Sequence, residues 1–231
     1  FRLEPAHWAA VLEVGTNHPG ELRPLLEWIR PGYGVFTGVG REHLEFFGDL
    51  AGVAEEEGTL AEALPEEGVL VMNGDDPWAA AIAGRTRAQV VRVGWGEGND
   101  WRARLLALGW DGTRFEVEGP VRAFEGEYRL RLLGRHQVRN ALLVMAMGER
   151  LGLTAAEVRM GLAACAPAPH RLASSEVRGV RVLDDSYNAN PDSMRAALET
   201  FCELPCAGRR VAVLGEMAEL GPSSEAAHAE V

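Results

Sequence analysis

The stretch DDSYNANPDSM, residues 184–194, lies between a short apolar run at 180–183 and a helical repeat of apolar side chains that begins at Met194. A strand followed at once by a helix predicts a strand-to-helix turn here. Asn190 suits the N-cap, and Pro191 suits the first helical position, where no backbone N–H is missed. Ligands of open α/β sheets bind beyond the carboxyl ends of the strands. The stretch is therefore either a well-capped connection with solvated acids or one wall of a ligand site.

The sequence before this turn alternates between strand-like and helix-like patterns. Short apolar runs at 9–14, 34–37, 69–72 and 90–93 fit buried strands. Helical repeats separate them, at about 20–29, 50–64 and 78–82. Strands joined through helices pair in parallel, because a parallel connection needs a long crossover. The pattern predicts an α/β fold with a doubly wound, mostly parallel central sheet.

The section from 94 to 133 changes to an alternation of period two. Apolar and polar residues alternate at 101–105, 114–117 and 128–132, with glycine turns between these pieces. Such alternation is typical of strands that have one buried face and are joined by hairpins. We expect an antiparallel flank on the central sheet.

A stiff segment, Ala166-Pro167-Ala168-Pro169, follows two predicted helices at about 137–151 and 155–164. Proline fixes the backbone and ends helices, so this segment predicts a domain boundary. We expect a central domain at 1–169 and a second domain at 170–231.

The second domain is predicted to start as a Rossmann-like α/β unit. A strand at 180–184, a helix at 191–204 and a strand at 210–214 follow one another. One such unit is too short to close a core of its own. The domain is therefore expected to be truncated in this chain.

The composition fits a soluble globular protein. Of the 231 residues, 47% are hydrophobic and 25% are charged. No apolar run approaches the roughly 20 residues of a membrane span, so membrane insertion is not expected. The net charge of −11 argues against nucleic acid or an anionic membrane as the main partner. The three cysteines lack a metal-type spacing, which favours a reducing, cytoplasmic setting.

All 23 basic residues are arginine, and lysine is absent. This excludes a Schiff-base lysine, a lysine general base and a phosphate loop of the GxxxxGK[ST] type within these residues. A phosphorylated ligand would need arginines, helix N-termini or a metal ion to meet its charge.

Three side chains of the first domain are candidates for one metal site. Glu13 ends an apolar strand pattern, His43 follows the next strand, and Glu57 lies on the apolar stripe of its helix. Carboxylates and imidazole are suitable ligands for Mg²⁺ or Mn²⁺ when phosphates complete the shell. Each residue can instead have its own environment. Glu13 can pair with an arginine, His43 can bond to a backbone carbonyl, and Glu57 can lie at the less tightly packed edge of the apolar stripe. The sequence leaves both interpretations open.

Polar residues also occur at the start of the predicted helix near 137 and at the proposed hinge. His136 and Asn140 can cap that helix or face a base or a phosphate. Arg171 is either a solvated surface residue or within reach of a phosphate between the domains.

Several of these segments, taken together, resemble the Mur ligase family of ATP-dependent enzymes, which add amino acids to the peptide of the cell-wall precursor. The matching stretches are 11–15 with 19–21, 37–40 with 43–44 and 47–48, 73–77, His136 and Asn140, 170–171, 184–191 with 193–194, and 213–221. Their order and spacing cover the whole chain. The run Tyr187-Asn188-Ala189-Asn190-Pro191 is the most specific, because it distinguishes one member from the relatives that add alanine, glutamate or a diamino acid.

The resemblance implies a ligase of peptidoglycan precursor synthesis that adds D-alanyl-D-alanine to UDP-N-acetylmuramoyl-tripeptide. The γ-phosphate of ATP would activate a carboxyl group as an acyl phosphate, which the amine of the dipeptide then attacks. Mg²⁺ would neutralise charge on the transferred phosphoryl group. The implied cofactors are ATP and Mg²⁺, and we expect a monomer.

The resemblance also implies roles for individual residues. Glu13, His43 and Glu57 would hold magnesium; Asn73, His136 and Asn140 would lie near the adenine and ribose; Arg171 and Asp185 would reach the nucleotide; and Tyr187, Asn188 and Asn190 would line the junction with the dipeptide. His43, Glu57, Arg171 and Asp185 are the implied catalytic residues.

The chain departs from the family pattern in three respects. Glu57 stands where the family usually has a lysine modified to a carbamate, and Gln137 stands where asparagine is common. The phosphate loop and the uridine-nucleotide domain are expected before residue 1, and the rest of the last domain after residue 231. The chain as given is therefore expected to be an incomplete portion that does not turn over ATP.

Two alternatives to this ligase remain. A non-catalytic nucleotide-binding or scaffolding module of the same fold would also lack the lysine and the phosphate loop. A ligase similar to folylpolyglutamate synthase would share the fold and the chemistry, although the run at 187–191 disfavours it.

Overall fold

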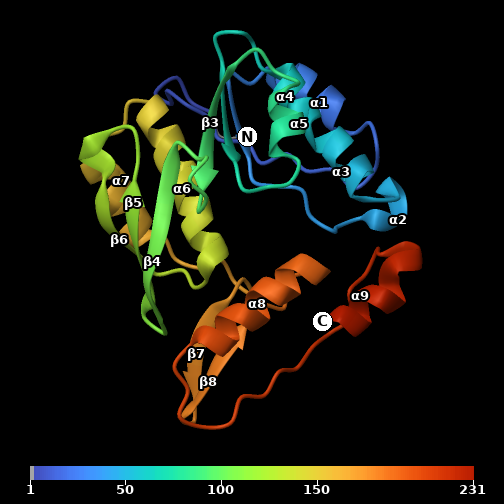
Figure 1. The fold of residues 1–231 in the computed structure, drawn as a ribbon, viewed down its shortest axis with the longest axis vertical. Coiled ribbons are helices and arrows are strands. Elements are labelled where there is room, and N and C mark those ends of the chain that lie inside the picture. Colours follow the sequence, from blue (N-terminus) through green and yellow to red (C-terminus); the bar gives the residue numbers. More distant parts are fainter. Residues whose placement is uncertain (1–2) are drawn as a thin grey trace.

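The computed structural model describes residues 3–231, which form a six-stranded sheet with its helices and a smaller unit around a two-stranded sheet (Figure 1). The first unit contains α1 (Leu22–Ile29), β1 (Tyr33–Phe36), α2 (Leu44–Phe47), α3 (Leu50–Glu57), α4 (Thr59–Ala63), β2 (Val69–Asn73), α5 (Ala79–Ala83), β3 (Gln89–Gly94), β4 (Trp101–Gly109), β5 (Gly112–Glu118), η1 (Arg122–Phe124), β6 (Gly126–Leu130), α6 (Arg135–Arg150) and α7 (Ala155–Ala164). The second contains β7 (Ala173–Val177), β8 (Val180–Asp184), α8 (Pro191–Glu203), η2 (Gly221–Ser223) and α9 (Ser224–Glu230). None of the helices in this described part is long and apolar enough to cross a membrane.

The strands of the larger sheet follow the order β1-β2-β3-β4-β5-β6. β1 to β4 pair in parallel, and β4, β5 and β6 pair antiparallel. The antiparallel part begins at a tight hairpin, in which Gly109 pairs with Gly112. The predicted α/β class, with a mostly parallel central sheet and an antiparallel flank, is confirmed.

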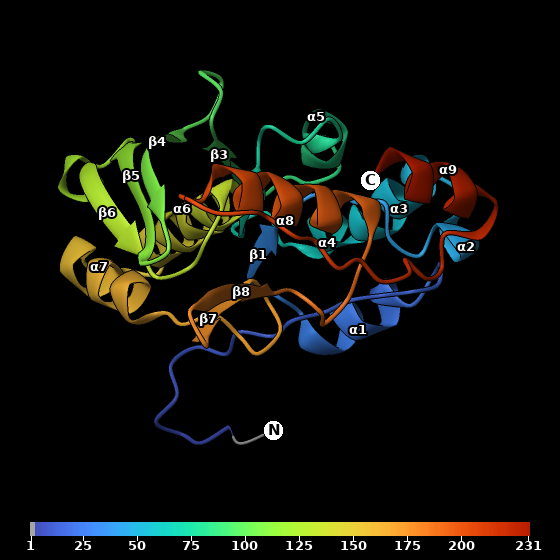
Figure 2. The same cartoon turned by 90° about the horizontal axis from the view of Figure 1, so that it is seen from below.

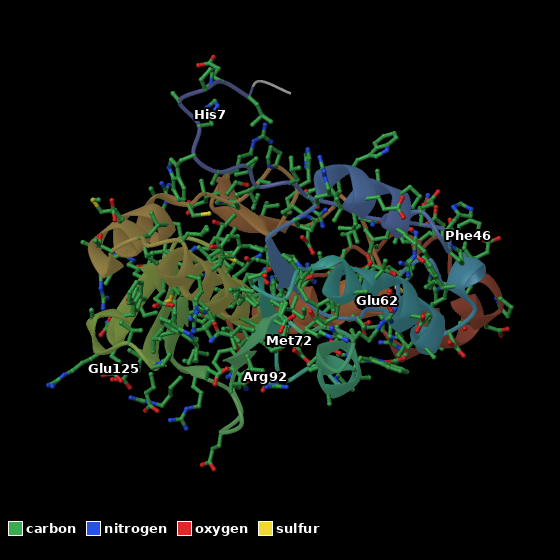
Figure 3. All side chains as sticks on the ribbon, turned by 90° about the horizontal axis from the view of Figure 1, so that it is seen from above. His7, Phe46, Glu62, Met72, Arg92 and Glu125 are labelled. Atoms are coloured by element: carbon green, nitrogen blue, oxygen red, sulfur yellow. The ribbon has the colours of Figure 1, made fainter. Side chains whose placement is uncertain are left out.

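Apolar side chains on the two faces of this sheet form two separate cores. Leu70 and Met72 of β2 are buried against α4 and α5. Val69 and Val71 point to the opposite face and are buried with Trp101 and the apolar side of α6. Side chains alternate along a strand, so the wholly apolar β2 contributes to both cores at once. Met72 is fully buried, and Figure 3 labels it near the middle of the view.

The helix predicted at 50–64 is divided into α3 and α4 at Gly58. The guanidinium of Arg85 donates to the carbonyl oxygen of Glu55 at 2.9 Å and so takes one of the last free acceptors of α3. It also occupies the space in which a Cβ at position 58 would lie. A long side chain from another part of the fold therefore ends the first helix.

Two predicted strands, at 9–14 and 210–214, are wrong. Both stretches run without regular structure, and Val11 and Val213 are 95% and 93% exposed. A strand is held by hydrogen bonds to a neighbour, and neither stretch pairs with any strand among residues 3–231. Figure 2 shows the N-terminal stretch running along the outside of the molecule. An apolar pattern indicates an extended backbone, but it does not show whether a neighbouring strand is present to pair with it.

The strand predicted at 180–184 forms as β8 but is not buried. It pairs antiparallel with β7 in a hairpin, and Val180 is 63% exposed. The sequence did not indicate β7, because its residues are mostly small or polar. The stretch at 210–214 does not join this sheet. Of the predicted strand-helix-strand unit, only the first strand, β8, and the helix α8 therefore form, and β8 pairs with β7.

The end of the chain returns to the central unit and packs on α2 and α3. Leu44 and Val53 form a buried cluster with Met217, Leu220 and Ala227. Figure 1 shows α9 near α2, while α8 lies between the central unit and the β7–β8 hairpin. The two units are thus joined by apolar contact as well as by the chain at 165–172.

Candidate functional site

The loops that follow β1 and β2 are bonded to each other at the carboxyl ends of these strands. Asp76 accepts a hydrogen bond from the backbone N–H of Val39 at 2.8 Å. Gly38 has a φ of +146°, and a Cβ there would lie 2.9 Å from Asp76 Oδ2 and 3.5 Å from Asn73 Nδ2. Glycine allows this close approach because it has no side chain. Asn73, which was predicted to contact a nucleotide, is buried in this corner.

Asp75 fixes the loop between β3 and β4. Its carboxylate accepts hydrogen bonds from the backbone N–H of Trp95 at 2.6 Å and of Gly96 at 3.1 Å, and from the Asn99 amide at 2.7 Å. Such bonds to an ionised acceptor are among the stronger ones in proteins. The adjacent acids Asp75 and Asp76 therefore hold two different loops, a division that the sequence did not reveal.

Glu57 is a largely buried carboxylate that lines a cavity of about 740 Å³. Burial, with Glu42 and Glu56 nearby, raises the pKa of Glu57 to about 7. Glu13 lines the same cavity from the N-terminal stretch. A strongly perturbed carboxyl group in a cavity is a candidate functional group.

His43 has a different partner. It lies in the left-handed region with a φ of +55°, which is uncommon outside glycine, and its Nδ1 is hydrogen-bonded to the carboxylate of Glu219. Among residues 3–231, no three His, Cys, Asp or Glu side chains are grouped to hold a metal ion.

The structure therefore does not bring Glu13, His43 and Glu57 together as one ligand set. Glu13 and Glu57 share a cavity, whereas His43 is bound by the C-terminal segment. One physical reason is that Glu13 lies on a stretch that no strand ladder holds in place. As arranged here, these three residues do not fit a metal ion.

The first turn of α6 packs closely against α8. Gly134 has a φ of +101°, and a Cβ there would lie 2.7 Å from the ring of His136 and 2.5 Å from the hydroxyl of Thr200. Burial lowers the pKa of His136 to about 4, so its imidazole is neutral at pH 7. The Asn140 amide donates to the side-chain oxygen of Gln137 at 3.3 Å. Beside Arg135, this turn thus carries three uncharged polar side chains, those of His136, Gln137 and Asn140.

The hinge is bonded to the turn after β8. The backbone N–H of Leu172 donates to Asp185 at 2.9 Å, and the Arg171 guanidinium lies over the ring of Tyr187, 4.0 Å from its centroid. A cation over an aromatic face is attracted by the ring. Burial raises the pKa of Asp185 above its usual range, against the opposing effect of the Leu172 hydrogen bond. The predicted pair Arg171 and Asp185 thus lies on one connected surface with Tyr187.

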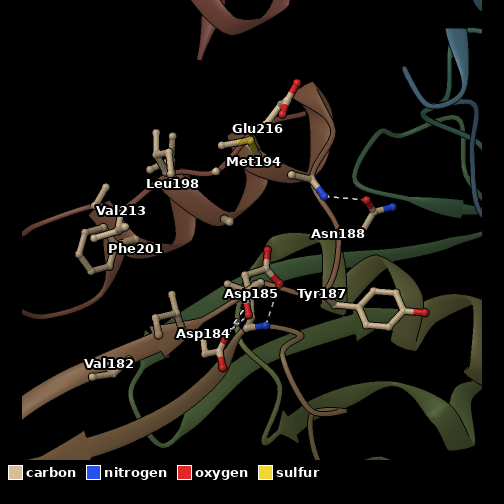
Figure 4. Close-up of a pocket in the computed structure, with 18 of the residues that line it drawn as sticks. Val182, Asp184, Asp185, Tyr187, Asn188, Met194, Leu198, Phe201, Val213 and Glu216 are labelled. Carbon is tan, nitrogen blue, oxygen red and sulfur yellow. Dashed lines mark hydrogen bonds between the residues drawn. The ribbon is translucent and has the colours of Figure 1, made fainter. Parts of the chain in front are cut away.

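A second cavity, of about 650 Å³, opens beside this turn (Figure 4). Asp185 and Asn188 line its polar part, while Leu198 and Phe201 of α8 and Val213 line its apolar part. In Figure 4 the Tyr187 ring points away from these apolar side chains. The cavity combines a few polar groups with an apolar wall, as small-molecule sites commonly do.

Asn190 caps α8, as predicted. Its side chain accepts a hydrogen bond from the backbone N–H of Ser193 at 2.8 Å, and the Ser193 hydroxyl accepts one from the backbone N–H of Asn190 at 3.1 Å. Pro191 occupies the first helical position. Of the three turn residues predicted to contact substrate, Asn190 is engaged in this cap and Tyr187 is 65% exposed.

Replacing Asn190 with alanine is expected to lower the free energy of unfolding by about 1 kcal/mol, because the Ser193 N–H loses its acceptor. Asn190→Asp keeps an acceptor at the same place and is expected to be close to neutral. Urea unfolding of the two variants distinguishes them. An equal decrease in the free energy of unfolding in both variants would show that Asn190 does not stabilise the protein through its capping hydrogen bond.

Sequence reasoning missed the contacts that join the two units. Arg41 in the loop after β1 binds Asp192 of α8, and Glu219 binds His43. The only local signals were an arginine close after a glycine pair and an acid in a helical first turn. Neither signal identifies its partner.

Two family models match the chain. The Mur ligase middle domain matches residues 2–148, and the domain described as Mur ligase, glutamate ligase domain, matches residues 170–231. The first match covers the six-stranded sheet, and the second covers the β7–β8 hairpin with α8 and α9.

Two curated relatives share the name UDP-N-acetylmuramoyl-tripeptide–D-alanyl-D-alanine ligase. That of Escherichia coli (strain K12) is 38% identical over 237 residues, covering 100% of this chain and 51% of the relative. That of Mycobacterium bovis is 39% identical over 225 residues, covering 94% of this chain and 44% of the relative. The chain therefore spans about half the length of the curated relatives it matches.

Two solved structures of similar fold carry the name MurF. A crystal structure of MurF from Acinetobacter baumannii has a TM-score of 0.91 and 30% identity, covering 98% of this chain and 49% of that one. The structure of MurF from Thermotoga maritima in complex with ADP has a TM-score of 0.80 and 27% identity, covering 93% of this chain and 48% of that one. The arrangement of both units is thus similar to that in these proteins.

Proposed function

The chain belongs to the Mur ligase family, and we propose that the intact protein joins D-alanyl-D-alanine to UDP-N-acetylmuramoyl-tripeptide with ATP as the energy source. Relatives that are 38% and 39% identical carry the name of this activity. The resemblance gives the run from Tyr187 to Pro191 as distinctive of this activity, and the next residue, Asp192, is bonded to Arg41 of the central unit.

The proposed reaction has two steps. A carboxylate oxygen of the tripeptide attacks the γ-phosphorus of ATP, ADP leaves, and an acyl phosphate forms. The amine of D-alanyl-D-alanine attacks the acyl carbon, phosphate leaves, and the amine proton passes to a base. Magnesium enters as the counterion of ATP and is part of the substrate.

In this proposal the chain binds and orients the reactants. Asn73, His136 and Asn140 contact the nucleotide from the central unit, and His136 does so as a neutral imidazole. Arg171 and Asp185 contact it from the hinge and the turn after β8. The roles of Asn73, His136 and Asn140 depend on hydrogen bonds with uncharged groups, which suit a base or a ribose better than a phosphate.

One observation carries the proposal. The loop that leads to His43 and the turn predicted to contact the dipeptide are held together through Arg41 and Asp192, with the Arg41 N–H 2.8 Å from the carboxylate. In this proposal the nucleotide side and the dipeptide side of the site are neighbours across the two units. A ligase needs this arrangement, because its two reactants must meet in one orientation.

The test is a ligation assay with the intact protein. With ATP, Mg²⁺, UDP-N-acetylmuramoyl-tripeptide and D-alanyl-D-alanine, phosphate release and a product of the summed mass less one water are expected. Omitting any one reactant, or supplying L-alanyl-L-alanine instead, is expected to abolish product. Absence of product with all the reactants present, from a protein shown to be folded, would refute the proposal.

A nucleotide-binding module without ligase activity is the second candidate. It is favoured by the absence of lysine and by the separation of His43 from Glu13 and Glu57. Calorimetry that shows ATP binding, together with no product in the ligation assay, would support it. Transfer of glutamate to a folate acceptor would instead indicate the folylpolyglutamate alternative.

A further inference from the structure

Arg41 is the centre of a charged network between the two units. Its Nε and Nη2 donate to Asp192 Oδ1 at 3.0 and 2.8 Å, and its backbone N–H donates to Asp192 Oδ2 at 2.8 Å. Its Nη1 donates to Glu230 Oε2 at 2.6 Å, and Arg195 pairs with the same Glu230. One arginine thus holds α8 and α9 at the same time.

The geometry of this network is more restrictive than that of a typical surface ion pair. The Arg41 side chain is only 22% exposed, and three donors of one residue meet a single carboxylate. Burial acts to raise the pKa of Asp192, but the hydrogen bonds from Arg41 outweigh it, and the pKa is lowered. Asp192 is therefore ionised at neutral pH, and the contact is a charge-assisted one.

The network joins two segments that carry candidate site residues. Arg41 precedes His43 by two positions in the loop after β1, and Asp192 lies two positions after Asn190, at the end of the turn that contains Tyr187. The far end of α8 is held separately, since Arg135 donates to Glu203 at 3.1 Å. Ala189 and Met194 pack against the cluster that contains Leu44 and Val53, so this end of α8 also has apolar contacts with the central unit. Arg41 adds the directional contact, because its hydrogen bonds fix the first turn of α8 and the turn before it against the loop at 38–43.

We propose that Arg41 and Asp192 are positioning residues for the ligation, which fix the turn at 187–190 against the loop at 38–43 and so align the dipeptide amine with the activated carboxyl group. This inference rests on the proposed function for its catalytic part. Its structural part, the ordering of the turn by the ion pair, is independent of that function. Neither residue needs to touch a substrate.

The experiment compares Arg41→Ala, Asp192→Ala and the double variant of the intact protein. Hydrogen exchange at 187–194 is expected to become faster in Arg41→Ala, because the turn loses its anchor. The kcat/KM for D-alanyl-D-alanine is expected to fall about 10- to 100-fold, the scale of effect that a misplaced reactant produces. The KM for ATP is expected to stay within about twofold, because a misplaced reactant loses alignment rather than nucleotide binding.

Two further variants keep the result interpretable. Arg104→Ala removes an arginine from the exposed Arg104–Glu116 pair on the β4–β5 flank and is expected to change neither readout. Arg41→Lys keeps the positive charge but cannot make both guanidinium hydrogen bonds to Asp192. An intermediate decrease in kcat/KM for D-alanyl-D-alanine is therefore expected.

The double variant decides the mechanism. If the two residues act as a pair, its loss is no larger than that of the more strongly affected single variant, which is expected to be Arg41→Ala because Arg41 also binds Glu230. Losses that multiply, or unchanged hydrogen exchange at 187–194 in Arg41→Ala, would overturn the inference. If the unsubstituted protein makes no ligation product, the proposed function fails, while faster exchange in Arg41→Ala alone still supports the anchoring of the turn.

Discussion

Replacing Glu57 with glutamine is expected to stabilise the metal-free protein by about 3 kcal/mol at pH 8. The pKa of Glu57 is raised from 4.5 to about 7, first by burial and then by the charges of Glu42 and Glu56. The folded state therefore keeps a proton that the unfolded chain has already lost. The stability gained from that proton is fully present below pH 4.5 and is lost as the pH rises through 7.

The effect of Glu57→Gln should thus depend on pH in a defined way. At pH 4 the two proteins are expected to unfold with similar free energies, and the difference should grow as the pH rises and level off above pH 7. Urea unfolding in a chelating buffer, at several pH values, measures it. Glu66→Gln, at an exposed glutamate, is the matched control and is expected to show no such trend. A constant difference between pH 4 and pH 8 would contradict the raised pKa.

Replacing Trp101 with alanine is expected to lower the free energy of unfolding by about 4 kcal/mol. Trp101 is fully buried at the start of β4, where its ring meets that of Phe124 edge to face at a centroid distance of 5.5 Å. Gly119 lies directly against the ring, so the surrounding backbone cannot collapse freely into the space left behind. The melting temperature is expected to fall by about 8 to 16 °C.

Two comparisons test the cause of this loss. Trp28→Ala removes the same side chain at a position that is 83% exposed and should change stability by less than about 0.5 kcal/mol. Trp101→Phe should cost less than Trp101→Ala, because the ring remains and the buried indole N–H, which has no hydrogen-bond partner in the described structure, is removed. Equal losses at positions 28 and 101 would contradict a packing origin.

Local features of the fold were predictable from the sequence, because they depend on neighbouring residues. The start of α8 is one example, since Asn190, Pro191 and Ser193 form its cap within four positions. The strand pattern of β2 is another, because an unbroken apolar run fits a strand with two buried faces. Both predictions are confirmed, because a helix cap and an apolar run each depend on residues that are adjacent in the sequence.

Features that depend on distant partners were not predictable. The stretches at 9–14 and 210–214 have strand-like sequences, but a strand forms only with a neighbour, and the sequence does not name one. The bond between Arg41 and Asp192 joins residues 151 positions apart. The bond between His43 and Glu219 also joins distant segments, and the sequence does not indicate that His43 has this partner while Glu13 and Glu57 line one cavity.

Helix α6 gives these observations a mechanical consequence. Its first turn touches α8 at Thr200, and its last turn contributes Met147 and Arg150 to the wall of the cavity that contains Glu57. The helix has 16 residues and acts as a stiff rod about 24 Å long, because every turn is hydrogen-bonded to the next. One continuous helix therefore connects the contact with the second unit to the wall of the cavity that Glu57 lines.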